Sequence, residues 1–138
     1  MKEYLKKLRE PGQRVNLLFP FLGVKVERLE PDKVVLCLPW REDFLQGAGV
    51  VAGGVMATLA DEAMAHVVLI NLEPGESTAT IEMNIRYLRT IEKGELRAVA
   101  TVVKKGRKIL TVAADILDEK DRLLAQAGAS FMVVEKKS

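Results

Sequence analysis

Apolar and polar residues alternate over the segment 77–89, a pattern typical of a β-strand with one face toward a core. The apolar positions are Ala79, Ile81, Met83, Ile85 and Tyr87. Turn residues separate three further strand-like stretches, at 95–104, 108–118 and 122–134. Because the connections are short, we expect these four strands to form an antiparallel meander.

The first half of the chain predicts two more strands and one long helix. The strands, 22–30 and 33–40, are joined by a Pro-Asp pair that suits a hairpin turn. After a loop, the segment 53–72 is apolar on most of its circumference and is ended by a Pro-Gly pair. Such a helix needs cover on all sides, and a curved antiparallel sheet wrapped around it would supply most of that cover. The expected fold class is therefore α+β.

An N-terminal extension, residues 1–21, precedes the hairpin. Residues 2–10 are expected to form a short helix that Pro11 ends, and their scattered charges do not suit a signal peptide. No repeat or linker divides the chain, so residues 1–138 are expected to form one domain.

A glycine-rich loop runs into the long helix, and the helix carries two carboxylates. The start of a helix has unpaired N–H groups and the positive end of the helix dipole. Gly53 and Gly54 lack a Cβ, so a substrate oxygen can approach their amides closely. Asp61 follows two turns later, with Glu62 beside it. The combination suggests a site that polarises a carbonyl; the alternative is that the glycines only let the helix pack tightly against a sheet.

Composition excludes several classes of partner. The net charge of +2 on 138 residues and the small number of aromatic residues argue against a nucleic-acid partner. One histidine and one cysteine do not make a metal site, and the single Cys37 excludes an internal disulfide, which fits a reducing cytoplasm. Charged Asp61 and Glu62 lie in the middle of the apolar segment 50–72, which argues against a membrane span.

The order of elements and the residues at the helix resemble the hotdog fold, in particular acyl-CoA thioesterases of the phenylacetic-acid-degradation type. The resemblance covers residues 22–134. The family signature is His-Gly-Gly followed by an acid after Leu-Ala; here the run is AGGVMATLAD, from Ala52 to Asp61, so the histidine is replaced. Other pieces that resemble the family are TIEMNIRYLR at 80–89, KKGR at 104–107, and the last strand with Ala125, Ala127 and Phe131.

The resemblance implies catalytic roles for four residues. Asp61 would attack the thioester or activate water, and the Gly53 amide would polarise the carbonyl. Gln46 stands where the family has an asparagine, and Thr80 where a hydroxyl orients the attacking water, although Thr80 also suits a plain strand. Asp61 could alternatively cap a neighbouring backbone group. Along one helix Gly53 and Asp61 lie about 12 Å apart, and family members solve this by dimerising, so we expect the site at the interface of a homodimer or a dimer of dimers (a homotetramer).

Two other groups of residues are candidates for the site. Glu62 is the rival carboxylate, but it shares a helix face with His66, most simply as a surface or interface contact. We also expect coenzyme A to be held by Gly54, Arg89, Lys104, Lys105, Gly106 and Arg107, because its phosphates suit a basic cluster and the basic residues are expected at the ends of adjacent strands. The resemblance adds that Arg107 after Gly106 matches a position that often lies beside the nucleotide. The alternative for the basic residues is a solvated, charged hairpin.

The expected function is hydrolysis of an acyl-CoA thioester to the acid and free coenzyme A by a cytoplasmic enzyme, with no cofactor other than the coenzyme A of the substrate. Since Ala52 replaces the usual histidine, the alternative is a hotdog module that binds or senses acyl-CoA without cleaving it. A hotdog hydratase is disfavoured because its Asp-His pairing is not recognisable here.

Overall fold

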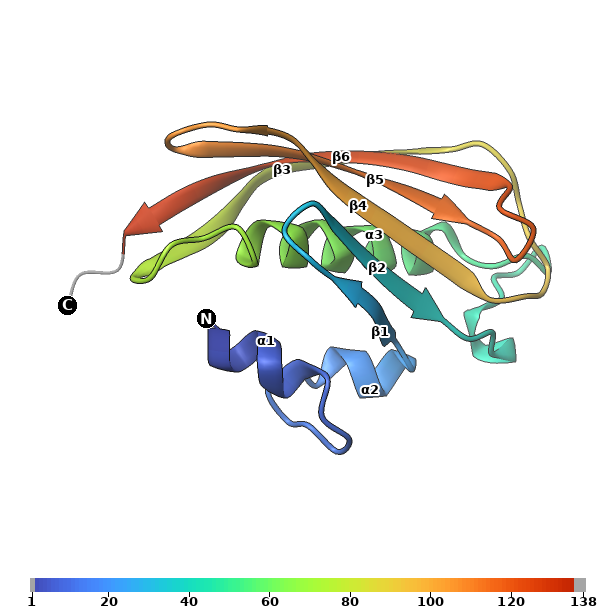
Figure 1. Cartoon of the computed structure of the whole chain (residues 1–138). Coiled ribbons are helices and arrows are strands. Elements are labelled where there is room, and N and C mark those ends of the chain that lie inside the picture. Colours follow the sequence, from blue (N-terminus) through green and yellow to red (C-terminus); the bar gives the residue numbers. More distant parts are fainter. Residues whose placement is uncertain (1, 136–138) are drawn as a thin grey trace.

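The computed structural model describes residues 2–135, and its elements follow the chain in this order (Figure 1): α1 (Lys2–Leu8), α2 (Leu18–Leu22), β1 (Lys25–Leu29), β2 (Lys33–Leu38), the 3-10 turn η1 (Glu42–Phe44), α3 (Gly53–Leu69), β3 (Glu76–Tyr87), β4 (Leu96–Lys105), β5 (Ile109–Leu117) and β6 (Leu123–Glu135).

One curved antiparallel sheet covers the long helix. Its six strands lie in the order β1-β2-β4-β5-β6-β3, and every neighbouring pair is antiparallel. Helix α3 runs along the inside of the curve (Figure 1). The α+β class and the hotdog architecture expected from the sequence are confirmed.

The expected meander is wrong for its first strand. Strands β4, β5 and β6 form a meander, but β3 pairs with β6 at the edge of the sheet, from Glu76 opposite Glu135 to Tyr87 opposite Ala125. The edge of β4 that β3 would have used is occupied by β2. The link 88–95 is long enough to cross the end of the sheet, which the turn residues in it did not reveal (Figure 1).

The alternation in β3 is also only partly a core pattern. Met83 and Ile85 pack against the core, whereas Ile81 and Tyr87 are 48% and 51% exposed and Ala79 is exposed. The register with β6 shifts between Thr80 and Glu82, so residues on either side of the shift no longer share a face. Strand β3 therefore presents apolar side chains at an open edge.

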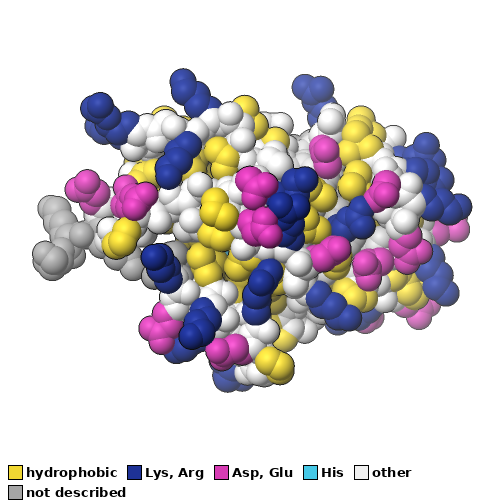
Figure 2. Space-filling view, viewed as in Figure 1, with side chains coloured by type: hydrophobic (Ala, Val, Ile, Leu, Met, Phe, Trp, Pro, Cys, Tyr) yellow, Lys and Arg dark blue, Asp and Glu magenta, His cyan; other side chains and the backbone are white. Residues whose placement is uncertain are grey.

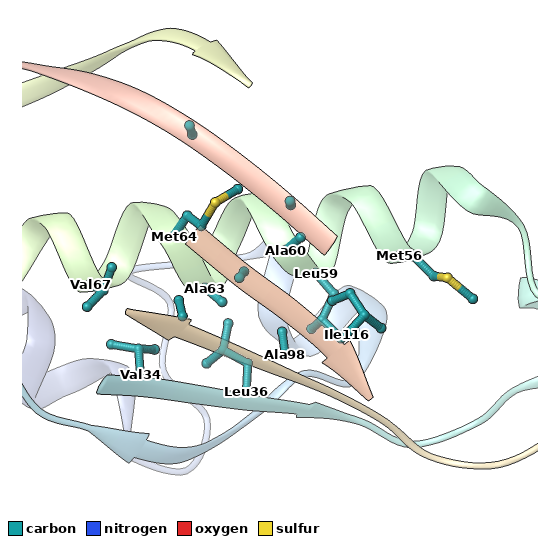
Figure 3. Close-up of a cluster of buried hydrophobic side chains, with 14 of the residues drawn as sticks. Val34, Leu36, Met56, Leu59, Ala60, Ala63, Met64, Val67, Ala98 and Ile116 are labelled. Carbon is teal, nitrogen blue, oxygen red and sulfur yellow. The ribbon is translucent and has the colours of Figure 1, made fainter. Parts of the chain in front are cut away.

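The core lies between α3 and the sheet. Leu59, Met64 and Val67 of α3 and Leu36 of β2 are almost fully buried (Figure 3). Small side chains of α3 and the central strands let the helix approach the sheet closely, as native packing density requires. These include Ala60, Ala63, Ala98 and Ala114.

The ends of the helices differ from the expected ones in small, explicable ways. Helix α3 stops at Leu69 rather than Leu72, where the Asn71 side chain donates hydrogen bonds to the Val67 and Pro31 carbonyls. Helix α2 was not expected, because it is a single short turn around Pro20. No helix within residues 2–135 is long and apolar enough to cross a membrane.

Candidate active site

The start of α3 opens onto a pocket of about 350 Å³. Val50, Val51 and Met56 form much of its apolar lining, and Gln46 and Arg89 contribute polar groups. Gly53 of the first helical turn and residues 87–90 after β3 complete the lining. Three residues predicted for the site, Gln46, Gly53 and Arg89, thus meet at one pocket.

Backbone hydrogen bonds hold the glycine-rich loop in place. The Val51 amide donates to the Ile91 carbonyl at 2.8 Å, and the Ala52 amide donates to the Phe44 carbonyl at 2.8 Å. Within the loop that lies between Phe44 and Val51, the Gln46 side-chain oxygen accepts a hydrogen bond from the Ala48 amide. The loop therefore joins η1 to the link after β3, and delivers Gln46 to the pocket.

The first turn of α3 carries unpaired donors. Its N-cap residue, Ala52, has no side chain that could cap the helix. The Ala52 carbonyl accepts from the Val55 amide at 3.0 Å and from the Met56 amide at 3.4 Å. For the Gly53 and Gly54 amides, residues 2–135 provide no acceptor. These two N–H groups are left to bind a polar atom from outside the chain.

Tyr87 lies directly against Gly53, whereas the alternation along its strand predicts only that it lies on the core face. Its hydroxyl donates to the Gly53 carbonyl at 2.8 Å. A Cβ on Gly53 would lie 2.9 Å from the ring carbon Cζ of Tyr87, so a side chain there would push the tyrosine ring away. Gly53 therefore permits the close approach of the tyrosine; its own φ is not positive, so the backbone conformation does not call for glycine. The two residues are 34 positions apart, so no local signal could have paired them.

Asp61 and Glu62 lie two turns along the helix from the pocket. Asp61 is partly buried, and burial raises its pKa. Burial also raises the pKa of Glu62, and the charge of Asp61 raises it further. Asp61 does not line the pocket at the helix start. Within one chain the predicted base and the predicted carbonyl-binding amide are thus separate, as the length of the helix requires.

Thr80 and the basic turn lie elsewhere in the single chain. Thr80 is exposed on β3, at the register shift and opposite Phe131. Gly106 makes the tight β4–β5 turn: its amide donates to the Ile109 carbonyl, and a Cβ would lie 2.6 Å from that carbonyl oxygen. Lys104, Arg107 and neighbouring residues surround a second pocket of about 360 Å³ at this turn.

The expectation that Arg89 lies at the ends of strands adjacent to this turn is wrong. Tyr87, just before Arg89, pairs with Ala125, which is level with Ile116 and Ala98 at one end of the sheet. Lys105 pairs with Leu110 at the opposite end. The reason is the edge position of β3 described above.

Basic and acidic side chains are interspersed over most of the face of the molecule in Figure 2.

His66 is buried, not at the surface or at an open interface as the sequence suggested. Its Nδ1 donates to the Glu62 carbonyl at 2.6 Å, so Nε2 accepts the Tyr4 hydroxyl proton at 2.8 Å. Asn16 in turn donates to the Tyr4 oxygen, and the Phe19 ring lies 5.1 Å from the imidazole. The Glu62 carboxylate approaches Nδ1 only to 3.9 Å. The N-terminal extension therefore covers the histidine and fixes it in a structural role.

Residues 2–135 contain no group of three His, Cys, Asp or Glu side chains that could hold a metal ion.

A family model described as the thioesterase superfamily matches residues 48–125, more than half of the chain. The chain belongs to the thioesterase superfamily. The matched segment begins in the glycine-rich loop, contains all of α3 and reaches the start of β6.

Individual relatives match most of the chain. A “Putative esterase” of Saccharolobus solfataricus is 26% identical over 137 residues, covering 99% of this chain and 97% of the relative. A Listeria monocytogenes protein named 1,4-dihydroxy-2-naphthoyl-CoA hydrolase is 27% identical, covering 84% of this chain and 94% of the relative. A crystal structure of a Haemophilus influenzae thioesterase has a TM-score of 0.83 at 25% identity, covering 89% of this chain and 86% of that one.

Replacing His66 should reduce the loss of stability at acid pH. Burial lowers the folded-state pKa of His66 below its ordinary value of about 6.5. As the pH falls through the ordinary pKa, the histidine of the unfolded chain gains a proton before that of the folded protein does, so the free energy of unfolding decreases. Urea unfolding at about pH 7.5 and about pH 5 should therefore show a larger decrease for the wild type than for His66→Gln.

Asp61 and Glu62 have raised pKa values and act in the opposite direction, but both proteins contain them. The difference between the two proteins therefore isolates the histidine. An equal decrease in both would show that the buried imidazole is not the acid-sensitive group.

Proposed function

We propose that this protein hydrolyses an acyl-CoA thioester to a carboxylic acid and free coenzyme A. The observation that carries the proposal is the pair of unpaired Gly53 and Gly54 amides beside a partly apolar pocket, in a chain of the thioesterase superfamily. A relative whose name states a CoA ester as its substrate supports the choice of thioester.

The reaction needs a donor and a base on either side of the thioester carbonyl. The Gly53 amide would donate to the carbonyl oxygen as negative charge develops there, an interaction worth about 3 kcal/mol per donor in the transition state. Asp61 would act as the nucleophile or remove a proton from the attacking water, with Thr80 orienting that water. Partial burial raises the pKa of Asp61, which makes its carboxylate a stronger base than an exposed one.

A dimer would bring the two halves of this site together. Strand β3 is a 12-residue edge strand, and an open edge of this length is a template for pairing with another chain. Ile81 of β3 and Met132 of the neighbouring β6 are 48% and 46% exposed apolar residues. We infer that two β3 strands pair across a two-fold axis, so that the helix start of one subunit faces Asp61 of the other. Pairing of two such dimers would give the expected tetramer.

The replacement of the usual histidine by Ala52 favours a second candidate, a module that binds acyl-CoA without cleaving it. Gln46 lines the pocket beside Gly53, and in hydrolysis it would orient the substrate in place of the imidazole. We favour hydrolysis because Gly53, Gly54 and Asp61 are all present at the matching positions. Activity measurements on Asp61 variants separate the two candidates.

Asp61→Asn should lower kcat at least ~10²-fold while leaving substrate binding intact, because it keeps the shape of the side chain but removes the base. Glu62→Gln is the matched control: it removes the adjacent carboxylate, which faces His66, and should have a far smaller effect. The measurement is thiol release from a panel of acyl-CoA esters. Equal activity in the wild type and Asp61→Asn would favour the binding module. A collapse only in Glu62→Gln would assign the chemistry to the neighbouring residue.

Arg107→Ala should raise KM and weaken its dependence on salt, with kcat largely unchanged. The Arg107 side chain is exposed at the basic β4–β5 turn, where it can attract the phosphates of coenzyme A without contacting the thioester. Lys120→Ala removes an exposed cation from the β5–β6 turn and serves as the control. If both variants keep the wild-type KM, the basic turn is only a solvated hairpin.

Light scattering at micromolar concentration should show a dimer or a larger even-numbered oligomer. Ile81→Lys, which places a charge on the exposed β3 edge, should shift the protein toward smaller species and reduce activity in parallel. Leu17→Lys is the control, since Leu17 is an exposed apolar residue of the N-terminal extension. A folded monomer that retains full activity would contradict the shared site.

A further inference from the structure

Beyond the four expected catalytic residues, one aromatic side chain contacts the backbone that carries the site. Tyr87 is the last residue of β3, and its hydroxyl donates to the Gly53 carbonyl at 2.8 Å. Its ring lies so close to Gly53 that a Cβ there would come within 2.9 Å of Cζ and 3.1 Å of Cε1 and Oη, and would displace the ring. The edge strand of the sheet is thus joined directly to the first turn of α3.

The contact adds to the hydrogen bonds that hold this first turn, among them those from the Val55 and Met56 amides to the Ala52 carbonyl. Ala52 provides no side-chain cap, and two consecutive glycines have the widest backbone freedom of any residue pair. A peptide unit is planar, so the Gly53 carbonyl and the Gly54 N–H lie in one plane and point in opposite directions. A hydrogen bond that fixes the carbonyl therefore also fixes the direction of the Gly54 amide.

We propose that Tyr87 is a positioning residue for thioester hydrolysis: it orients the Gly53–Gly54 peptide so that the unpaired Gly54 amide points, together with the Gly53 amide, at the thioester carbonyl. This inference rests on the proposed function and adds to it a residue outside α3. Tyr87 reaches Gly53 from the strand whose open edge would pair with a second subunit. Formation of the dimer and the orientation of the amides are then linked through one strand.

Tyr87→Phe tests the hydrogen bond alone, because the ring that packs on Gly53 is kept. Small misalignments of catalytic groups cost up to about 10²-fold in rate, and for this single lost bond we expect kcat to fall about 10-fold with KM changed less than about twofold. Thr78→Val is the matched control, since it removes a side-chain to backbone hydrogen bond of 2.8 Å to Met132 from the same strand. The control should keep the wild-type kcat, and both variants should keep the wild-type melting temperature.

A second measurement reads the amides directly. In protein labelled with ¹⁵N-glycine, Tyr87→Phe should shift the Gly53 and Gly54 amide signals, and Thr78→Val should leave them in place. A Tyr87→Phe variant with wild-type kcat, or with a raised KM and unchanged kcat, would overturn the positioning role. So would unmoved glycine signals.

The two measurements separate failure of this inference from failure of the proposed function. If the wild-type protein cleaves none of the CoA esters, the proposed reaction is wrong, and the catalytic role of Tyr87 falls with it. The glycine signals then still decide whether Tyr87 orients the first turn for a bound ligand.

Discussion

Burial of α3 on opposite sides is the constraint on which the rest of the structure depends. Met64 and His66 are 0% and 2% exposed, although at 100° per residue they lie about 200° apart around the helix. One sheet cannot cover both sides. The curved sheet packs on α3 through its central strands, and the N-terminal extension brings Tyr4 and Phe19 over His66. The hydrogen bond from Tyr4 satisfies the one polar side chain that this arrangement buries on the far side of the helix.

Groups of a helix enclosed in this way can reach a substrate only where the sheet and the N-terminal extension leave the helix accessible. One such place is its start, where two amides are unpaired beside a pocket. The other is the partly exposed surface around Asp61, where burial is sufficient to raise the pKa of the carboxyl. The length of the helix separates the two places, and this is why a second subunit enters the proposed mechanism. The same edge strand that would recruit that subunit also contacts the helix start through Tyr87.

The backbone around the site is held by groups both near and far away in the sequence. The loop before α3 is pinned by the carbonyls of Phe44 and Ile91, and the first turn by the hydroxyl of Tyr87. None of these is a neighbour that a motif would contain. Gly53 illustrates the consequence: a double glycine at a helix start is visible in the sequence, but the ring that a side chain would displace belongs to a residue 34 positions later.

Periodicity and turn residues were sufficient to predict α3 and every strand of the sheet, because each of these properties is local and repeats along the chain. The run from Ala52 to Asp61 similarly indicated the family and the candidate acid. The place of β3 beside β6, the exposure of Ile81 and the separation of Arg89 from the basic turn were decided only by tertiary structure. Strand order depends on which edges remain free after the others have paired, and residue spacing does not record that. For the same reason the sequence indicated His66 as a surface contact, whereas folding of the N-terminal extension over α3 made it part of the interior.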